Sequence, residues 1–492
     1  MESQIRTIGL LITFVATIYA LRRGRDMPAL VFLVLAPFSY FAQNLFVVFT
    51  PAKLMGLIFL GGALLKPSYI SALGGRYVSA FLPYFFYLLT LTIIMPLGWP
   101  EHSVDRQGFL YGNTARGFVQ IFQMVMGLSI IAVIIRSLTS ANSLLRAQVA
   151  LLVTMVVVSA YGIYVWFAQR LGLPFNPIDR QGKGGELGRE IVAVVDGVYR
   201  MRAYSLTGEP KTLAVNACSG LMLVFFTAAN QTGFTKNVFG KLLLAFLFLT
   251  TLLLTLSTAG FVILPMMIIL ALAIQVRIGQ VGGRFVVTFI VAVGLASLAM
   301  PFVSQFSIGD MWRVLDMRLT GRLSEDGFFT YADSAALSLL SDQPMFAVTG
   351  VGMGGSSFYV REYDVLSYAG FTAAPRGIIG FITDRGILGL LLFLIPMYNA
   401  ARPLIALATS NSPNRRIYGG ILILCAIHIL LMFTAGQWHD EWLAIGLICA
   451  GATVASRERS FARTCRDSMS RPLVPGSATD HRFSIYSRGL PK

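Results

Sequence analysis

Apolar runs long enough to cross a lipid bilayer recur along most of this 492-residue chain. A hydrocarbon core ~30 Å thick requires roughly 20 apolar residues in a helix. Hydrophobic residues make up 55% of the chain and charged residues only 13%, whereas soluble globular proteins carry about 25% charged residues. The sequence therefore excludes a soluble enzyme, a disordered scaffold and a disulfide-rich secreted module. It predicts an all-α, polytopic transmembrane protein.

The apolar runs predict about 12–13 membrane spans, with long polar segments in two places. The expected spans lie near residues 5–21, 28–48, 53–66, 77–96, 117–136, 147–170, 212–229, 236–256, 258–275, 284–302, 386–407, 416–435 and 440–456. The chain thus divides into N-terminal helices at 1–170, a loop at 171–211, central helices at 212–302, a large loop at 303–385, C-terminal helices at 386–456 and a polar tail at 457–492.

The first apolar segment, residues 8–21, is followed by Arg22, Arg23 and Arg25, with no small-residue cleavage site after it. We therefore expect a retained membrane anchor and not a removed signal peptide. Of the four cysteines, three lie in apolar segments and one in the polar tail. This distribution predicts free thiols and not a disulfide framework.

The orientation follows from the excess of Lys and Arg that cytoplasmic loops carry. With the C-terminal tail placed in the cytoplasm, every expected inner connection is basic, and Asp26 is the only acid among them. The basic residues of these connections are Arg22, Arg23, Arg25, Lys66, Arg76, Arg136, Arg146, Lys236, Lys241, Arg277, Arg284, Arg402, Arg415 and Arg416. The same alternation puts the N-terminus and both long loops outside the cytoplasm.

The large loop at 303–385 contains six arginines, nine acids and no lysine. The planar guanidinium of arginine can bind two phosphate oxygens at once, which the ammonium of lysine cannot do. An all-arginine loop above a membrane therefore indicates a phosphorylated ligand near the lipid headgroups. The alternative interpretation is that these arginines form salt bridges with the acids of the same loop.

Three segments on the outer side stand apart from the apolar background. The first, Arg202-Ala-Tyr-Ser-Leu-Thr-Gly-Glu-Pro210, runs directly into an expected span. Proline suits the first turn of a helix and a carboxylate suits its positive end, so a plain helix start explains Glu209 and Pro210. Capping does not explain Arg202.

The second segment begins with Thr320-Gly-Arg-Leu323 and ends with a glycine cluster at residues 350–355. Between them, residues 328–341 keep apolar side chains at helical spacing, which predicts a helix on the outer bilayer surface. The glycine cluster formally fits a dinucleotide-binding fingerprint, but it follows a loop and lacks the strand that should precede it. The two interpretations left for this cluster are a tight turn and the close approach of a ligand to the backbone.

The third segment runs from Pro375 to Gly389. Pro375 can open a helix in which Arg376 and Thr383 share one face. Asp384 and Arg385 are then expected at the outer edge of the next span, where ionised groups survive without deep burial.

In this order, the motifs resemble the O-antigen ligase and O-antigen/exopolysaccharide polymerase superfamily over roughly residues 200–400. The resemblance rests on Arg202 with Gly-Glu-Pro before a span, Ser257-Thr258-Ala-Gly260 opening another, Gly321-Arg322, the glycine cluster, and the Asp384-x-Gly-Ile-Leu-Gly stretch. It implies an integral membrane glycosyltransferase of the bacterial inner membrane. Such enzymes join glycan from a polyprenyl-pyrophosphate carrier to an acceptor glycan on the periplasmic face.

The chain departs from the ligase branch of this superfamily at two places. The His-Asn pair common in ligases falls on Pro375-Arg376, and the Ser-Arg usual near Ser257 reads Ser-Thr-Ala. We therefore favour a polymerase of exopolysaccharide or O-antigen repeat units. A ligase, a transporter or flippase of lipid-linked glycan, and a structural assembly subunit are the alternatives. Transporters usually place ionisable groups near the midplane, whereas here they lie at the ends of the expected spans.

In such a reaction, fixed arginines would stabilise the negative charge that develops on the departing phosphate. The candidate substrate-binding residues are Arg202, Arg318, Arg322, Arg361 and Arg376. The acceptor hydroxyl needs a proton acceptor, for which Glu209 and Asp384 are the candidates.

His439 could replace the missing histidine of the family as the base, whereas His428, inside a span, is expected to be a packed or hydrogen-bonded residue. Glu362 and Asp364 resemble an acidic metal-binding pair, although a solvated loop is the expected state. We expect no cofactor and no metal. The expected partners are the lipid-linked donor, the glycan acceptor and the bilayer, with a chain-length regulator and a flippase as further partners and no nucleic acid.

Overall fold

The computed structural model describes residues 2–44, 48–99, 113–175, 192–195, 198–208, 210–231, 233–278, 331–356, 358–359, 377–434 and 438–469, together with Val291 and Gly294. Within these residues the protein is predominantly helical, as the sequence predicts. The strands form two small antiparallel hairpins, which pair β1 (Gln43–Asn44) with β2 (Val48–Phe49) and β3 (Val192–Val195) with β4 (Val198–Met201).

The helices fall into three groups along the chain. The first is α1 (Glu2–Arg23), α2 (Met27–Leu35), α3 (Pro51–Leu65), α4 (Pro67–Leu73), α5 (Arg76–Ser79), α6 (Leu82–Ile94), α7 (Asn113–Ser137) and α8 (Ala141–Leu171). The second is α10 (Pro210–Phe226), α11 (Val238–Leu254) and α12 (Thr258–Ile278). The third is α15 (Tyr331–Asp342), α16 (Pro344–Thr349), α18 (Gly377–Ala408), α19 (Arg415–Thr434) and α20 (Trp438–Met469).

Five of the described helices are long and apolar enough to cross a membrane, and a bent pair would make a sixth span. The five are Gln4–Arg23, Gly117–Ser137, Ala141–Leu171, Gly377–Ala408 and Arg415–Phe433. The protein is therefore a polytopic helical membrane protein. The expected count of 12–13 also includes shorter apolar helices, such as Pro210–Phe226 and Val238–Leu254. It further includes the span expected at 284–302, which lies outside the described residues apart from Val291 and Gly294.

The structure departs from the expected span at 28–48, and it adds a bend after the span expected at 53–66. The span expected at 28–48 is wrong, because α2 already ends at Leu35 and a short 3-10 turn and the strand β1 follow. Pro37 contributes to this end, because a proline has no backbone N–H to donate to the carbonyl oxygen of Leu33. The span expected at 53–66 is continued by α4 after a bend of 105° at Lys66 and Pro67.

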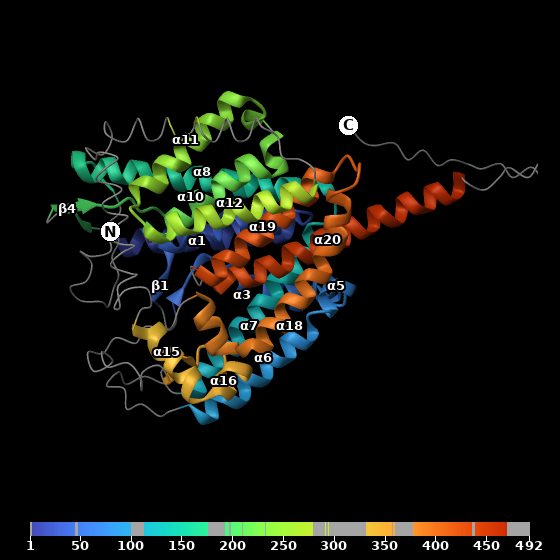
Figure 1. The fold of residues 1–492 in the computed structure, drawn as a ribbon, viewed down its shortest axis with the longest axis horizontal. Helices are drawn as coiled ribbons and strands as arrows, with labels where there is room; N and C mark the ends of the chain where they lie inside the picture. The colour runs from blue at the N-terminus through green and yellow to red at the C-terminus, as the bar shows by residue number, and fades with distance from the viewer. Residues whose placement is uncertain are drawn as a thin grey trace, which may run out of the picture.

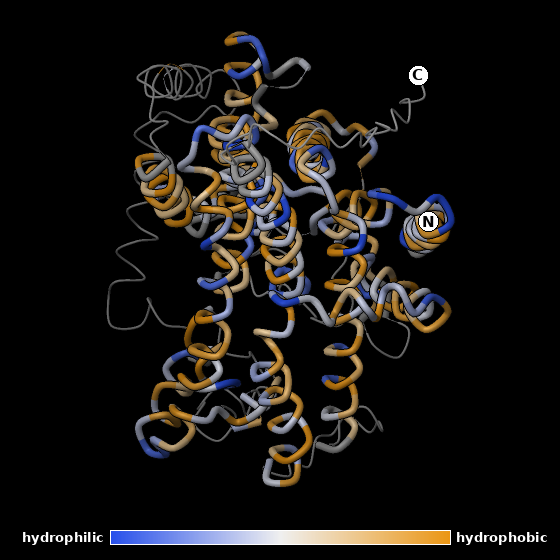
Figure 2. The backbone as a smooth tube through the Cα atoms, turned by 90° about the vertical axis from the view of Figure 1, so that its right-hand side faces the viewer, coloured by the Kyte–Doolittle hydropathy of each residue, from blue (hydrophilic) through white to orange (hydrophobic). Residues whose placement is uncertain are grey.

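The helices pack into one bundle, and hydrophobic residues lie along the length of most of them (Figure 2). Helix α20 packs against α7, α18 and α19. At one of these contacts Gly127 of α7 lies directly against the ring of Trp442. A Cβ atom added to Gly127 would lie only 2.2 Å from an atom of that ring. Small residues allow such close approach of helices in membranes. In Figure 1 the N-terminal end of α1 and β4 lie at the left, whereas α20 ends at the right.

Helix α18 is broken at Gly386, whose φ of 67° lies in the left-handed region. The break leaves the carbonyl oxygens of Thr383 and Asp384 outside the regular helical pattern. The backbone N–H groups of Val351 and Gly352 donate to these two oxygens at 2.8 and 2.9 Å. Irregular backbone at membrane depth requires such partners from the protein itself. The predicted glycine cluster therefore has a described role as the backbone partner of the α18 break.

Candidate functional site

A buried ion pair joins α18 to α20. The two terminal nitrogens of Arg385 donate to the two carboxylate oxygens of Glu441, each at 2.7 Å. Both side chains are withdrawn from solvent, with 12% of Arg385 and 4% of Glu441 exposed. Tyr84 of α6 completes the arrangement, because its hydroxyl donates to Glu441 and accepts from Arg385. A paired, bidentate geometry of this kind is what a buried charge requires.

Asp384 lies beside this ion pair and faces the glycine cluster. Its Oδ1 accepts the backbone N–H of Ser356 at 3.0 Å. Trp99 anchors the same segment, since its indole N–H donates to the carbonyl of Val351 at 2.7 Å. The Asp384 side chain is therefore held against residues 350–356. The sequence predicted both features separately, and the structure brings them together.

The first turn of α20 carries two further titratable groups. His439 is buried, with its Nε2 3.9 Å from Oδ1 of Asp440. The same Oδ1 lies 2.9 Å from Nδ1 of His428 on α19, so His428 is hydrogen-bonded inside the bundle, as expected for it. Nε2 of His428 and Oδ2 of Asp440 are buried and have no hydrogen-bond partner among the described residues.

These side chains form two hydrogen-bonded groups within the apolar bundle, one around Glu441 and one around the preceding residue Asp440, hereafter together the charged cluster. Its members are Tyr84, Asp384, Arg385, His428, His439, Asp440 and Glu441. The cluster contains both Asp384 and His439, the two predicted proton acceptors that the structure describes. Acids and an arginine at such a place are costly, and in membrane proteins they generally mark a functional site.

Arg202 lies at a different place in the bundle. Its Nε donates to the carbonyl oxygen of Thr255 at 2.9 Å, and the N–H of Ala203 donates to Leu254 at the same distance. The segment that carries Arg202 is thus fixed beside the segment that opens α12 at Ser257. No contact among the described residues joins Arg202 to the charged cluster. The Arg202 segment therefore meets the segment around Ser257, and Asp384 meets the end of the glycine cluster, at two separate positions.

Five predicted site residues lie outside the described residues. They are Glu209, Arg318, Arg322, Arg361 and Arg376. The acidic pair Glu362 and Asp364 also lies there. Arg385, an arginine of the same predicted loop, is described, and its partner is Glu441 rather than an acid of that loop.

An apolar cavity of about 240 Å³ opens between α3 and α7. Phe49, Lys53, Phe118, Val119, Phe122, Gln123 and Met126 line it. Phe118 is 65% exposed, so the cavity communicates with the outside of the bundle. The residue after Met126, Gly127, contacts the ring of Trp442 of α20.

Sequence reasoning missed Tyr84 and Ser356, and it gave Glu441 no role of its own. Tyr84 stands in the apolar run of α6 and carries no distinguishing pattern. Glu441 did offer a signal, because an acid at the start of an apolar helix calls for a partner of opposite charge. The partner, Arg385, is 56 residues away in the chain, so pairing the two needs the fold.

No group of three or more His, Cys, Asp or Glu side chains within the described residues is arranged to hold a metal ion. No family model, curated protein sequence or solved structure matches the chain.

Proposed function

We propose that this protein is a glycosyltransferase of the bacterial inner membrane that polymerises polyprenyl-pyrophosphate-linked oligosaccharide units on the periplasmic face. The product would be an exopolysaccharide or O-antigen. The N-terminus would then be periplasmic and the C-terminal tail cytoplasmic. Transfer of the glycan to a lipid or another acceptor, as a ligase performs it, is the variant of the same chemistry.

The charged cluster is the observation that carries this proposal. It collects Asp384, Arg385 and Glu441 from distant parts of the chain and surrounds them with buried apolar helices. Such a group is retained in a membrane protein when it serves binding or chemistry. The glycine cluster beside Asp384 adds support, because it brings backbone N–H groups close to a carboxylate.

In the proposed reaction the acceptor hydroxyl attacks the sugar carbon, and the lipid pyrophosphate leaves with the electron pair of the broken bond. Asp384 or His439 would take the proton of the hydroxyl. Arg385 serves as a positioning residue, because Glu441 already occupies both of its terminal nitrogens. Arg202, together with Arg318, Arg322, Arg361 and Arg376, would bind phosphate oxygens.

The apolar cavity between α3 and α7 fits the carrier lipid. Its exposed Phe118 and Phe122 would contact a methyl-branched hydrocarbon chain as it enters from the bilayer. Gly127, the residue after Met126, contacts Trp442 of α20, the helix that carries Glu441. The carrier tail would thus bind along α7, and the reacting pyrophosphate would bind beside α20, which packs against α7.

A transporter or flippase of lipid-linked glycan is the second candidate. The break of α18 at Gly386 favours it, since many transporters bind substrate at discontinuous helices. The buried pair of Arg385 and Glu441 would also suit a conformational change between two states. The two candidates differ in one measurable respect, because only the transferase makes a glycosidic bond.

The deciding experiment supplies purified, reconstituted protein with lipid-linked repeat units and analyses the products by gel electrophoresis. A ladder of longer lipid-linked glycans supports the polymerase. No new glycosidic bond, combined with movement of the intact substrate across the vesicle membrane, would establish the transporter. In cells, deletion should leave single lipid-linked repeats for a polymerase, long lipid-linked polymer for a ligase, and repeats trapped inside for a flippase.

Residue assignments can be tested in the same assay. We expect Arg202→Ala and Arg322→Ala each to abolish polymer while the protein still inserts in the membrane. Arg23→Ala serves as the matched control, since it removes an exposed arginine from the last turn of α1. Wild-type polymer yield from an arginine variant would remove that residue from the site.

A further inference from the structure

A second cavity in the described part of the structure shares no lining residue with the charged cluster. It has a volume of about 630 Å³ and is formed where α1, α2, α3, α4, α7 and α8 meet. Its lining is Leu21, Arg22, Gly24, Arg25, Asp26, Lys66, Ser68, Tyr69, Arg136, Ser137, Thr139, Ser140, Asn142, Ser143 and Arg146. We call this cavity the basic pocket.

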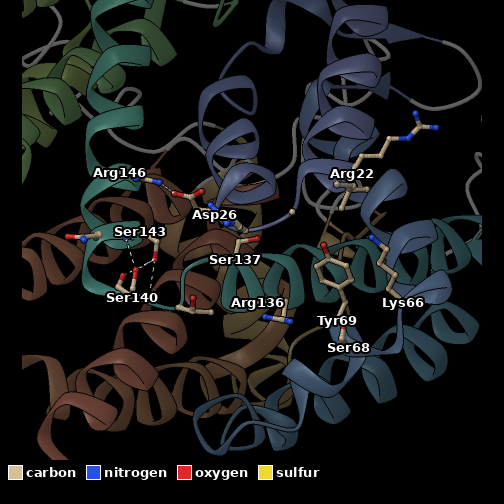
Figure 3. Close-up of a pocket in the computed structure, with 15 residues that line it drawn as sticks. Arg22, Asp26, Lys66, Ser68, Tyr69, Arg136, Ser137, Ser140, Ser143 and Arg146 are labelled. Carbon is tan, nitrogen blue, oxygen red and sulfur yellow. Dashed lines mark hydrogen bonds and ion pairs between the residues drawn. The ribbon is translucent and has the colours of Figure 1, made fainter. Parts of the chain in front are cut away.

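The basic pocket holds five basic side chains against a single acid, Asp26. That acid is already neutralised, because its Oδ2 accepts from Arg146 at 2.8 Å. Figure 3 shows Arg146 and Asp26 on one side of the pocket and Lys66 with Tyr69 on the other. The remaining positive charge therefore lines an open cavity whose wall contains no second acid.

The other lining groups suit the same kind of ligand. Six hydroxyl side chains line the pocket and can donate to anionic oxygens. The long helix α8 also begins here, at its N-cap residue Ser140, and its positive end adds to the field. Hydroxyls, arginines and a helix start together match phosphate oxygens better than they match a carboxylate or a neutral sugar.

The border of the pocket is apolar and exposed. Leu64 and Leu65, directly before Lys66, are 70% and 84% exposed, and Ile70, directly after Tyr69, is 50% exposed. The bend of 105° between α3 and α4 places these side chains beside the basic groups. A ligand that has a phosphate head and hydrocarbon chains can contact both surfaces at once, whereas a free phosphate uses only the first.

We propose that the basic pocket binds the phosphate headgroup of an anionic membrane lipid, with the acyl chains of the lipid lying across Leu64, Leu65 and Ile70. The site depends on the membrane nature of the protein and not on the glycosyltransferase proposal. Basic pockets between membrane helices are suited to anionic lipid headgroups. Lys66 and Arg136 are the principal ligands, since Arg146 is already paired with Asp26.

The test is native mass spectrometry of the detergent-purified protein, titrated with dioleoyl phosphatidylglycerol. Dioleoyl phosphatidylcholine has the same acyl chains without the net negative charge, and inorganic pyrophosphate supplies phosphate oxygens without chains. We expect wild-type protein to retain the anionic lipid in preference to the other two. The double variant Lys66→Gln/Arg136→Gln should bind it about 30-fold more weakly, from the usual contribution of each basic residue near a lipid surface.

The matched control is Arg23→Gln/Arg416→Gln, which removes two exposed basic residues that do not line the pocket. It should bind the anionic lipid as the wild type does. Equal loss in the control and the pocket variant would overturn the proposal, as would equal retention of both lipids by the wild type. Tight binding of pyrophosphate with no preference for the anionic lipid would also overturn it, in favour of a soluble phosphate ligand. The single variant Lys66→Gln changes only an exposed residue and gives the same comparison if the double variant is poorly folded.

Discussion

The charged cluster and the basic pocket handle charge in opposite ways. In the cluster, Arg385 and Glu441 are buried and bind each other through two hydrogen bonds. In the pocket, Lys66 and Arg136 are exposed and face a cavity in which the one acid is already paired. A charge buried among apolar helices needs a partner of opposite charge in the fold, whereas an exposed charge is solvated and remains available to bind a ligand. Substitutions at the two places should therefore have different consequences.

The largest effect is expected from breaking the buried pair. Glu441→Leu leaves the buried guanidinium of Arg385 without its carboxylate partner and should lower the free energy of unfolding by about 3–5 kcal/mol. The double variant Arg385→Met/Glu441→Leu should recover much of this loss, because it removes the unpaired charge. Thermal unfolding in detergent, followed by circular dichroism, measures both.

The pair of Asp26 and Arg146, in which the arginine is exposed and the aspartate is buried, is the matched control for that experiment. The side chain of Arg146 is 68% exposed, so Asp26→Asn should cost below about 1 kcal/mol. If Asp26→Asn and Glu441→Leu prove equally harmful, the contrast between the two regions is wrong.

The next largest effect concerns the break in α18. A Cβ atom on Gly386 would lie 2.1 Å from the carbonyl oxygen of Val348, and its φ of 67° disfavours other residues. Gly386→Ala should therefore destabilise the protein by at least about 1–3 kcal/mol, the usual cost of such a backbone conformation. Gly61→Ala, at a helical glycine with no atom within 4 Å, is the control and should unfold like the wild type. An unchanged unfolding temperature for Gly386→Ala would show that the break is not required.

A smaller, pH-dependent effect is expected at Glu458, near the far end of α20. Burial alone would raise the pKa of its carboxyl group, but hydrogen bonds from Tyr418, Ser412 and Asn414 outweigh burial and hold this pKa below the ordinary value of 4.5. The resulting stability is present above pH 4.5 and is lost as the pH falls through the lowered pKa. Glu458→Gln should thus unfold at a lower temperature than the wild type at pH 7. The difference in unfolding temperature between the two proteins should shrink as the pH falls below about 4. A difference that stays constant with pH would contradict this assignment.

The smallest effect is expected when charge is removed from the basic pocket in the absence of lipid. Lys66→Gln/Arg136→Gln should change the free energy of unfolding by no more than about 0.5 kcal/mol, as is usual for exposed positions. Relief of repulsion between like charges could make the change stabilising. A loss comparable to that of Glu441→Leu would mean that these residues support the fold and do not await a ligand.

The sequence predicted the membrane class and most helix positions because apolar runs have a direct physical meaning in a bilayer. It failed where the chain turns inside an apolar run. The span expected at 28–48 was extended past Pro37, because the hydropathy continues there although α2 ends at Leu35. The bend between α3 and α4 was also not foreseen, and it lies at Lys66 and Pro67, directly after the span expected at 53–66.

The sequence predicted Asp384 and His439 of the charged cluster, but it did not predict the contacts that hold the cluster together. Asp384 and His439 were candidates because they are polar residues at the edges of apolar runs. Their connection depends on Tyr84, which looks like any other aromatic residue of an apolar helix, and on the pairing of Arg385 with Glu441 across 56 residues. Single-chain periodicity carries no information on such distances, so these contacts require the structure.

The pairing of Val351 and Gly352 with the carbonyls of Thr383 and Asp384 has a consequence for biosynthesis. The two amides leave the ribosome some thirty residues before their acceptors do. This corner of the protein can close only after α18 has entered the bilayer, so its assembly must follow the insertion of the helices. A chain interrupted after Pro375 would carry two amides that still lack these acceptors.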